Sequence, residues 1–177
     1  MSFETILASE KIYEGHLIDL RVDQVRTPIG LEAVREVIEH PGAVGIVALD
    51  EQQRVVLVKQ YRHAVRAMTI EIPAGTLNAG EDPLAAAQRE LREEIGCRAE
   101  HIERMTGIDT APSFSTEHIH LYLATGLIPD RLAMDADEAI DVLRVSLPEA
   151  IEQIKSGAIT DGKTVGALLL AQVWLSQ

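Results

Sequence analysis

The sequence is poor in cysteine, aromatic residues and basic residues, and each shortage excludes a class of protein. The one cysteine, Cys97, cannot form an internal disulfide, which agrees with a reducing, cytoplasmic setting. Aromatic residues make up only 3% of the chain, so an extended base-stacking surface is not expected. Lysine and arginine total 16 against 28 acidic residues. The resulting net charge of −12 disfavours a nucleic-acid binder, because phosphate backbones are bound by basic side chains.

Long apolar runs and targeting features are also missing. No stretch approaches the run of about 18 apolar residues that a membrane-spanning helix needs, so no membrane association is expected. The start of the chain, Met1 to Glu4, lacks a basic region followed by an apolar one, so we expect no signal peptide. The length of 177 residues, 46% of them apolar, instead predicts a globular protein with a substantial core.

The pattern of apolar residues predicts strands through the first 60 residues and again after residue 98. The predicted strands cover residues 18–25, 31–39, 43–49, 55–60, 69–72, 99–107, 118–124 and 139–145. Residues 43–49 are almost wholly apolar, as in a strand covered on both faces. Helices are predicted over 148–155 and 161–175. Strands with helices before and after them predict an α/β fold, in which a mixed β-sheet is sandwiched between α-helices and preceded by N-terminal antiparallel strands.

The clearest predicted helix begins after Asp82, a good N-cap that is followed by a proline at the first helical position. Gly96 is the expected residue just past its end. Its apolar stripe consists of Leu84, Ala87, Leu91 and Ile95. This helix also carries three glutamates, which we expect on the side opposite the apolar stripe.

The three glutamates, Glu90, Glu93 and Glu94, share one face because residues three and four apart are neighbours on a helix. Their mutual repulsion costs some tenths of a kcal/mol per pair in water, and Arg89 and Arg92 would relieve part of it. A divalent cation would relieve more, and oxygen ligands are those that Mg²⁺ and Mn²⁺ prefer. From the helix alone, a solvated glutamate and arginine face and a metal site both remain open.

The residues around this helix resemble the Nudix box, G-x5-E-x7-R-E-U-x-E-E-x-G-U, in which U is aliphatic. The matching residues are Gly75, Glu81, Arg89, Glu90, Leu91, Glu93, Glu94 and Gly96. Cys97 fills the last aliphatic position as a small hydrophobic residue. Such a match arises by chance on the order of once in a million for a chain of this length. The sequence is therefore identified as a member of the Nudix hydrolase family.

The resemblance implies a Mg²⁺-dependent hydrolase, with Mn²⁺ as a possible substitute, that cleaves a nucleoside diphosphate linked to a second group. Glu90, Glu94 and the carbonyl of Ala74 are then the metal ligands, and Glu93 is a supporting residue. Gly75 is expected to let the chain turn sharply and to let the backbone approach the ligand.

Two further assignments follow from the same resemblance. Arg89 and Glu81 are expected to form an ion pair that orients the loop before the helix, which is a structural role. Family members often place a glutamate in a late loop as metal ligand or general base. Glu138 is the candidate in this chain, with Asp137 close behind it, and an acidic surface loop is the alternative reading.

Outside the box, several stretches resemble the ADP-ribose pyrophosphatase branch of the family. They are Arg35-Glu36-Val37, His40-Pro41-Gly42, Gln60-Tyr61-Arg62, Glu71-Ile72-Pro73-Ala74-Gly75, Pro112, His120-Leu121-Tyr122-Leu123-Ala124 and Asp161-Gly162-Lys163-Thr164. The branch usually has Gly-Phe after the proline, where this chain has Ser113 and Phe114. These two residues are expected near the terminal-ribose pocket. ADP-ribose, cleaved to AMP and ribose 5-phosphate, is the expected substrate, but the serine leaves GDP-mannose or another nucleoside diphosphate sugar open.

The branch also implies contacts from arginine and from a second subunit. Arg35 and Arg62 are candidates for binding phosphate or adenosine, because a planar guanidinium suits both contacts. Ordinary surface arginines are the alternative. In this branch the N-terminal strands often cross to a second subunit. We therefore divide the chain into N-terminal strands over residues 1–40, expected to dimerise, and a Nudix domain over 41–177, and we expect a homodimer.

Two other functions remain open from the sequence. A Nudix enzyme for a dinucleotide or for capped RNA would share the box, although the acidic charge counts against RNA. A non-catalytic sensor could bind ADP-ribose and regulate a partner protein, although the box of this chain is intact. His118 and His120 lack the sulfur or histidine partners of a zinc site, so a structural role is expected for both. Cys97 is not a credible nucleophile.

Overall fold

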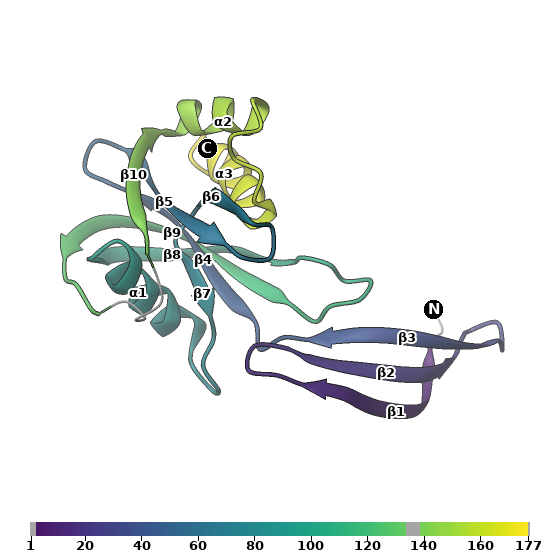
Figure 1. Ribbon diagram of the computed structural model, residues 1–177. Helices are drawn as coiled ribbons and strands as arrows, with labels where there is room; N and C mark the ends of the chain where they lie inside the picture. Colours follow the sequence, from purple (N-terminus) through teal and green to yellow (C-terminus); the bar gives the residue numbers. More distant parts are fainter. Residues whose placement is uncertain (1–2, 134–138, 177) are drawn as a thin grey trace. The chain divides into compact units, whose positions relative to one another are not determined.

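Three helices and ten strands make up the part of the chain that the computed structural model describes, residues 3–133 and 139–176 (Figure 1). The strands are β1 (Thr5–Glu14), β2 (Asp19–Arg26), β3 (Glu32–Glu39), β4 (Ala43–Leu49), β5 (Arg54–Arg62), β6 (Ala67–Glu71), β7 (Ala74–Thr76), β8 (Cys97–Asp109), β9 (His118–Pro129) and β10 (Asp141–Ser146). The helices are α1 (Pro83–Glu94), α2 (Leu147–Lys155) and α3 (Gly162–Trp174). They form two compact units: Met1–Gly42 with Asp109–His118, and Ala43–Ile108 with Ile119–Gln177.

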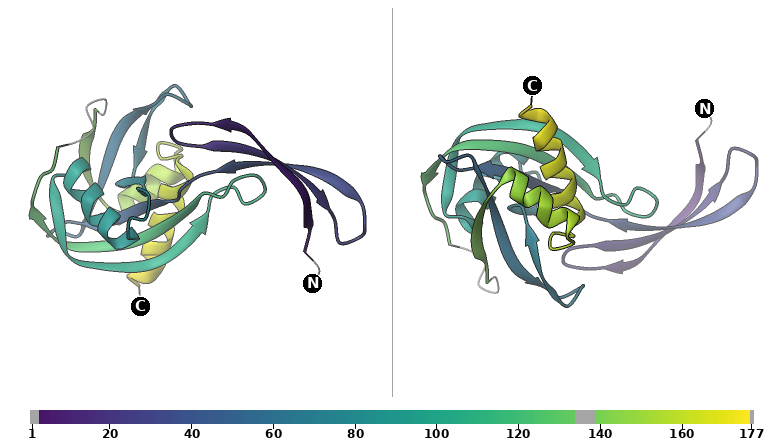
Figure 2. Two further views of the ribbon diagram at one scale, coloured as in Figure 1. Left: turned by 90° about the horizontal axis from the view of Figure 1, so that it is seen from below. Right: turned by 90° about the horizontal axis from the view of Figure 1, so that it is seen from above.

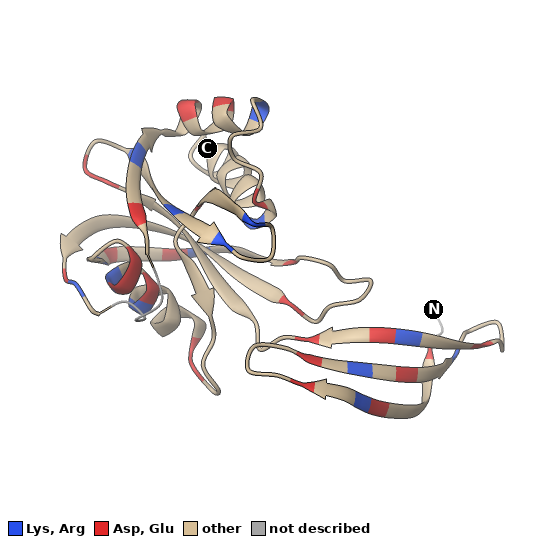
Figure 3. Cartoon of the chain, in the orientation of Figure 1, with Lys and Arg blue, Asp and Glu red and all other residues tan. Residues whose placement is uncertain are grey.

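The first unit is an antiparallel sheet in the order β1-β2-β3. Acidic and basic residues both recur along its strands (Figure 3). The segment Asp109–His118 belongs to this unit, because Ile38 donates its N–H to the carbonyl of Phe114 at 2.8 Å and accepts from the N–H of Thr116 at 2.9 Å. The attachment joins residues far apart in sequence, and the apolar pattern gave no sign of it.

The second unit contains a mixed sheet. Among the described residues its order is β10-β5-β4-β9-β8, with β6 added to β5 and β7 added to β4. Strand β4 pairs parallel with β9 and antiparallel with β5 and β7. Every residue of β4 is buried, as the apolar run predicts for a strand covered on both faces.

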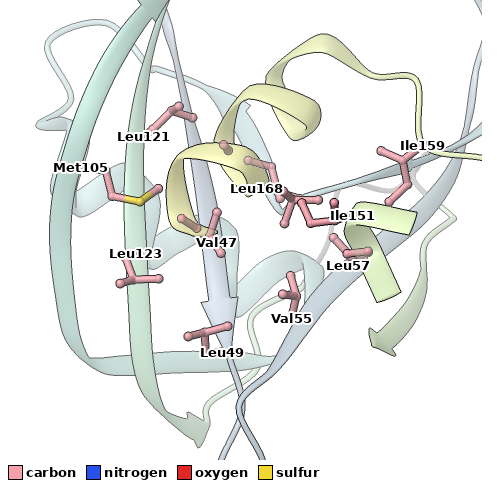
Figure 4. Packing of buried hydrophobic residues seen from close by; sticks show 14 of the residues in the cluster. Val47, Leu49, Val55, Leu57, Met105, Leu121, Leu123, Ile151, Ile159 and Leu168 are labelled. Carbon is pink, nitrogen blue, oxygen red and sulfur yellow. The ribbon is translucent and has the colours of Figure 1, made fainter. Parts of the chain in front are cut away.

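Helices cover both faces of this sheet, which confirms the predicted arrangement (Figure 2). Side chains alternate along each central strand, so Val44 and Ile46 of β4 pack beneath α1, while Val47 and Leu49 pack with α2 and α3 on the other face. Figure 4 shows this second cluster, in which Leu168 of α3 is fully buried. No described helix has both the length and the apolar character to cross a bilayer.

Helix α1 begins and ends where the sequence predicts. The Oδ1 atom of Asp82 accepts hydrogen bonds from the N–H groups of Leu84 and Ala85 at 3.0 and 3.1 Å, which satisfies two donors of the first turn. After the helix, Gly96 has a φ of +69°, a left-handed conformation that favours glycine. These two signals fix the register of the helix, and therefore the direction of its glutamates.

We predict that Leu168→Ala destabilises the protein by about 2–5 kcal/mol, because truncating a fully buried leucine loses apolar burial and leaves a cavity. The matched control is Leu169→Ala, one residue further along α3, where the side chain is 43% exposed. This control should cost less than about 1 kcal/mol. Urea unfolding followed by circular dichroism measures both, and equal losses would contradict the packing of α3.

Candidate active site

Strand β7 lies against α1, and Gly75 is the point of closest approach. A Cβ at residue 75 would lie 1.9 Å from Oε1 of Glu90, so the carboxylate occupies the space that a side chain would need. The expected sharp turn at Gly75 is wrong, because this residue lies within β7 and pairs with Val44 of β4. Glycine is required at residue 75 because the carboxylate of Glu90 fills the space of a side chain, and not because the backbone turns there.

Glu90 and Glu94 are buried, with 7% and 3% of their surface exposed. The interpretation of a solvated glutamate face is therefore wrong for these two residues. They also do not lie opposite the apolar stripe, because they are buried together with Ala87 and Leu91, whereas Leu84 is 43% exposed. Burying a carboxylate is costly unless it is paired, so their position needs compensating partners.

Each of the two buried carboxylates has partners within the protein. Oε2 of Glu94 accepts a hydrogen bond from the backbone N–H of Ala74 at 3.0 Å, which joins α1 to the start of β7. Oε1 of Glu90 accepts from Nη1 of Arg89 at 2.5 Å. These contacts hold both carboxylates beside the backbone of β7.

Arg89 gathers the acids around one guanidinium. It donates from Nε and Nη2 to the two oxygens of Glu81 at 2.8 and 3.0 Å, which is the predicted ion pair, and from Nη1 to Glu93 at 2.9 Å. The hydrogen bond to Glu81 is the main reason that the pKa of Arg89 is raised. The same hydrogen bond lowers the pKa of Glu81 from 4.5 to about 2. Arg89 therefore orients both the preceding loop and the glutamates of α1.

The groups that could hold a metal ion here are all oxygen donors. They are the carboxylates of Glu90 and Glu94 and the backbone carbonyl of Ala74, and such donors suit Mg²⁺ or Mn²⁺ rather than Zn²⁺. Within residues 3–133 and 139–176, no three acidic, histidine or cysteine side chains are grouped as a metal site. A cation at this position would therefore depend on the backbone of β7 as well as on side chains.

Near the carboxylates of α1, Arg62 of β5 is bound by Glu71 of β6. Nε and Nη2 of Arg62 donate to the two carboxylate oxygens of Glu71 at 2.8 and 2.7 Å, and Thr69 donates to Oε1 of Glu71 at 2.6 Å. The hydrogen bond to Glu71 is the main cause that raises the pKa of Arg62, and the charge of Glu94 contributes. Arg62 therefore lies within electrostatic range of Glu94.

The start of α3 completes this cluster. Lys163 forms an ion pair with Glu71 and lies 3.1 Å from Oδ2 of Asp161. The next residue, Thr164, accepts a hydrogen bond from the N–H of Ile72 at 2.9 Å and donates to Asp161 at 2.6 Å. A cavity of about 520 Å³ opens between this turn and the β5–β6 hairpin. The cluster thus combines two basic side chains, Arg62 and Lys163, with two carboxylates, Glu71 and Asp161, and a cavity adjoins it.

The other predicted site residues are not brought to this place within the second unit. Arg35, Ser113 and Phe114 belong to the first unit. Arg35 donates to Glu4 at 2.5 and 3.1 Å, and Phe114 is 51% exposed. Glu138 and Asp137 lie outside the described residues.

The two histidines take part in hydrogen bonds with neighbouring residues. Nδ1 of His118 lies 2.7 Å from Asp109, and Nδ1 of His120 lies 3.3 Å from Nη2 of Arg104. Both contacts agree with the structural role that the sequence predicts.

Sequence reasoning missed Glu71, Lys163 and Thr164 as members of the site. Both stretches that contain them resemble the ADP-ribose pyrophosphatase branch, but the resemblance assigns no role to these three residues. The missing information is spatial, because Lys163 and Glu71 are 92 residues apart in the sequence. The only signal in the sequence was an acid in one stretch and a lysine in the other, which does not show that they pair.

Comparisons with known families agree with the geometry. The model of the NUDIX domain matches residues 39–167, and the model of the nucleoside diphosphate sugar hydrolase N-terminal domain matches residues 4–38. The chain is also similar to a crystal structure of an ADP compounds hydrolase. That match has a TM-score of 0.89 and 24% identity and covers 99% of this chain and 96% of the other, so it shows a shared fold.

Two curated relatives are similar over nearly their whole length. A protein named methanol dehydrogenase activator, from Bacillus methanolicus, is 41% identical over 172 residues, which is 96% of this chain and 93% of that protein. A protein named ADP-ribose pyrophosphatase, from Bacillus subtilis (strain 168), is 37% identical over 172 residues with the same coverage.

We predict that Glu71 makes stability depend on pH between about 4.5 and 2. Burial by itself would raise the pKa of Glu71, but the hydrogen bonds and positive charges of Arg62 and Lys163 outweigh it and lower the pKa from 4.5 to about 2. The unfolded chain therefore binds the proton more tightly. The stabilisation, on the order of 3 kcal/mol, is complete above pH 4.5 and is lost as the pH falls through 2.

Glu71→Gln should lower the free energy of unfolding at pH 7, and its difference from the natural protein should shrink as the pH falls from 4.5 to 2. Urea unfolding at pH 7, 4.5, 3 and 2 measures this. Glu152→Gln is the control, because its side chain is 70% exposed. A difference between the natural protein and Glu71→Gln that stays constant over the whole range would contradict the assigned role of Glu71.

Proposed function

Because this chain belongs to the Nudix hydrolase family, we propose that it hydrolyses ADP-ribose to AMP and ribose 5-phosphate. The observation that carries this proposal is the pair of buried carboxylates, Glu90 and Glu94, packed against β7, with the charge of Glu94 acting on Arg62. Two buried anions suit a cation and an arginine suits phosphate, which together suit a diphosphate substrate. The similarity to an ADP-ribose pyrophosphatase over nearly the whole chain supports the choice of sugar nucleotide.

We assign the cation to Glu90, Glu94 and the carbonyl of Ala74, and we expect Mg²⁺, with Mn²⁺ as an alternative. Two observations support the fit: the donors are all oxygen, and Gly75 leaves the space that the Glu90 carboxylate occupies. When bound, such an ion neutralises diphosphate charge and acidifies water.

The remaining chemistry falls to the chain's own side chains. Arg62 binds the diphosphate, because its guanidinium can donate two hydrogen bonds to phosphate oxygens. Arg89 keeps the carboxylates of α1 in place through its contacts with Glu90 and Glu93. A general base must take a proton from the attacking water, and the candidates are Glu138 or a glutamate of the Nudix box.

We propose further that the protein is a homodimer built through residues 1–40. Strand β1 is exposed along its whole length, including the apolar side chains of Ile6, Leu7, Ile12 and Tyr13, which are 41–59% exposed. Exposed apolar side chains on a strand suit an interface with a second subunit. Arg35 would then act in the pocket of the partner subunit, as the resemblance to this branch implies. Gel filtration with light scattering tests this, and a monomer at micromolar concentration would contradict it.

We predict EDTA-sensitive hydrolysis of ADP-ribose, measured by phosphate release from the products with a coupled phosphatase. The panel contains ADP-ribose, GDP-mannose, NADH and diadenosine polyphosphates, each assayed with Mg²⁺ and with EDTA. Preference for ADP-ribose would make Ser113 a tolerated variation, whereas preference for GDP-mannose would keep the chemistry and change the sugar. Tight binding of ADP-ribose without cleavage of any compound would favour a regulatory protein instead.

We predict that Glu94→Gln lowers kcat by more than about 100-fold, because losing even the outer-shell partners of metal ligands costs about 10–100-fold. Glutamine can still accept the hydrogen bond from Ala74, so the fold is retained while the charge is lost. Kinetics at saturating Mg²⁺ measure the effect, and Glu149→Gln on the surface of α2 is the control. Unchanged turnover of Glu94→Gln would rule out this metal assignment.

A further inference from the structure

We propose that Lys163 is a positioning residue that acts through Glu71 to keep the guanidinium of Arg62 fixed and available to the substrate diphosphate. This inference rests on the proposed function, because it deepens the account of how the same site binds its substrate. Lys163 is assigned no direct contact with the substrate.

The first observation is the way Arg62 is held. Glu71 accepts from Nε and Nη2, so one edge of the planar guanidinium is fixed against the β5–β6 hairpin. In the part of the chain that the structure describes, Nη1 of Arg62 forms no hydrogen bond, and the side chain is 42% exposed. Nη1 carries two N–H donors, so Arg62 presents a fixed donor group toward solvent. Such an arrangement loses little side-chain entropy when it binds phosphate.

The second observation is the balance of charge around Glu71, whose side chain is only 2% exposed. One guanidinium and one carboxylate cancel each other, and Asp161 adds a second negative charge nearby. Lys163 pairs with both carboxylates and its side chain is 14% exposed, so its charge is poorly screened by solvent. With Lys163 the four charges sum to zero, and without it they sum to −1. Glu71 and Asp161 would then repel each other, and Glu71 would lose the fixed position from which it holds Arg62.

The third observation is that the backbone fixes the position of Lys163. The neighbouring Thr164 is fully buried and accepts a hydrogen bond from the N–H of Ile72, the residue after Glu71. Asp161 caps α3 by accepting from the N–H of Thr164 at 2.9 Å. The first turn of α3 is therefore tied to the strand that carries Glu71, and Lys163 has a fixed place above the carboxylate.

The fourth observation is the cavity of about 520 Å³, which is bordered by Arg62, Glu71 and Lys163. Met68 and Val65 form part of its apolar wall. A ligand can therefore reach Arg62 without displacing Lys163 from Glu71. In this geometry Arg62 binds the substrate, whereas Lys163 only positions Arg62.

The test begins with the natural protein and ADP-ribose at saturating Mg²⁺. Lys163→Met removes the charge at similar volume and should raise KM about 10-fold or more, with kcat changed less than about threefold. Lys163→Arg keeps the charge and should restore KM to within about threefold. Lys155→Met, an exposed lysine on α2 that changes the net charge equally, should leave KM unchanged. An unchanged KM in Lys163→Met would overturn the inference.

A double-mutant cycle separates positioning from an independent contribution of Lys163. In the background of Arg62→Lys, which cannot be held by two parallel hydrogen bonds, Lys163→Met should raise KM less than about threefold. A tenfold increase in both backgrounds would show that Lys163 does not act through Arg62 and would overturn the inference.

Circular dichroism and thermal unfolding check that each variant is folded. If Lys163→Met does not fold, Lys163→Gln takes its place, because glutamine can donate to Glu71 without carrying a charge.

A binding measurement distinguishes failure of this inference from failure of the proposed function. Calorimetric titration with α,β-methylene-ADP-ribose, which cannot be hydrolysed between its phosphates, gives Kd in the presence of Mg²⁺. If the natural protein neither binds this compound nor cleaves ADP-ribose, the proposed function falls and the inference falls with it. If the natural protein binds and Lys163→Met binds equally well, only the inference falls. We expect Kd to rise about 10-fold in Lys163→Met.

Discussion

The segment from Glu71 to Thr76 is held by both helical layers at once, and the candidate site depends on both attachments. On one face of the sheet, α3 binds the segment through Thr164 and Lys163. On the other face, α1 binds it through Glu94, which accepts a backbone N–H, and through Glu90, which fills the space above its glycine. The segment is short, so a shift of either helix would change the distance between the α1 carboxylates and Glu71, which binds Arg62. The packing of the sheet between its helices is therefore also what sets the spacing of the charged groups.

Local signals in the sequence were sufficient for most elements, but not for β1 and β7, and not for burial. Helix α1 begins after Asp82 and ends before Gly96 as predicted, because capping is a local property of the chain. The burial of Glu90 was not predicted, because helical periodicity places a glutamate on a face without saying what covers that face. The cover is β7, a three-residue strand with no apolar pattern of its own. Its partner β4 was predicted correctly, but the pairing of the two strands is a tertiary property.

The charged residues of the site illustrate the same limit. The spacing of the Nudix box identified Arg89 and its acids, since all of them lie within about two turns of one helix or in the loop before it. The pairing of Glu71 with Lys163 joins β6 to α3, and neither residue is remarkable in its own sequence context. The net charge of −12 was a poor guide to this site, because the buried acids Glu71 and Glu90 each have a basic side chain beside them. Local compensation, rather than total charge, decides whether an acidic protein can bind a phosphorylated compound.

The bond between Thr164 and Ile72 spans 92 residues, and this separation has a consequence for synthesis on the ribosome. The ribosome adds about 5–20 residues per second, so Ile72 is synthesised roughly 5–18 s before Thr164 of α3. During that interval the N–H of Ile72 and the carboxylate of Glu71 have no partner from α3. Contacts between distant residues also form late in folding, because the loop between them must close first. We therefore expect the nascent chain to form the central sheet before α3 fixes Arg62, so that the candidate site is among the last features to mature.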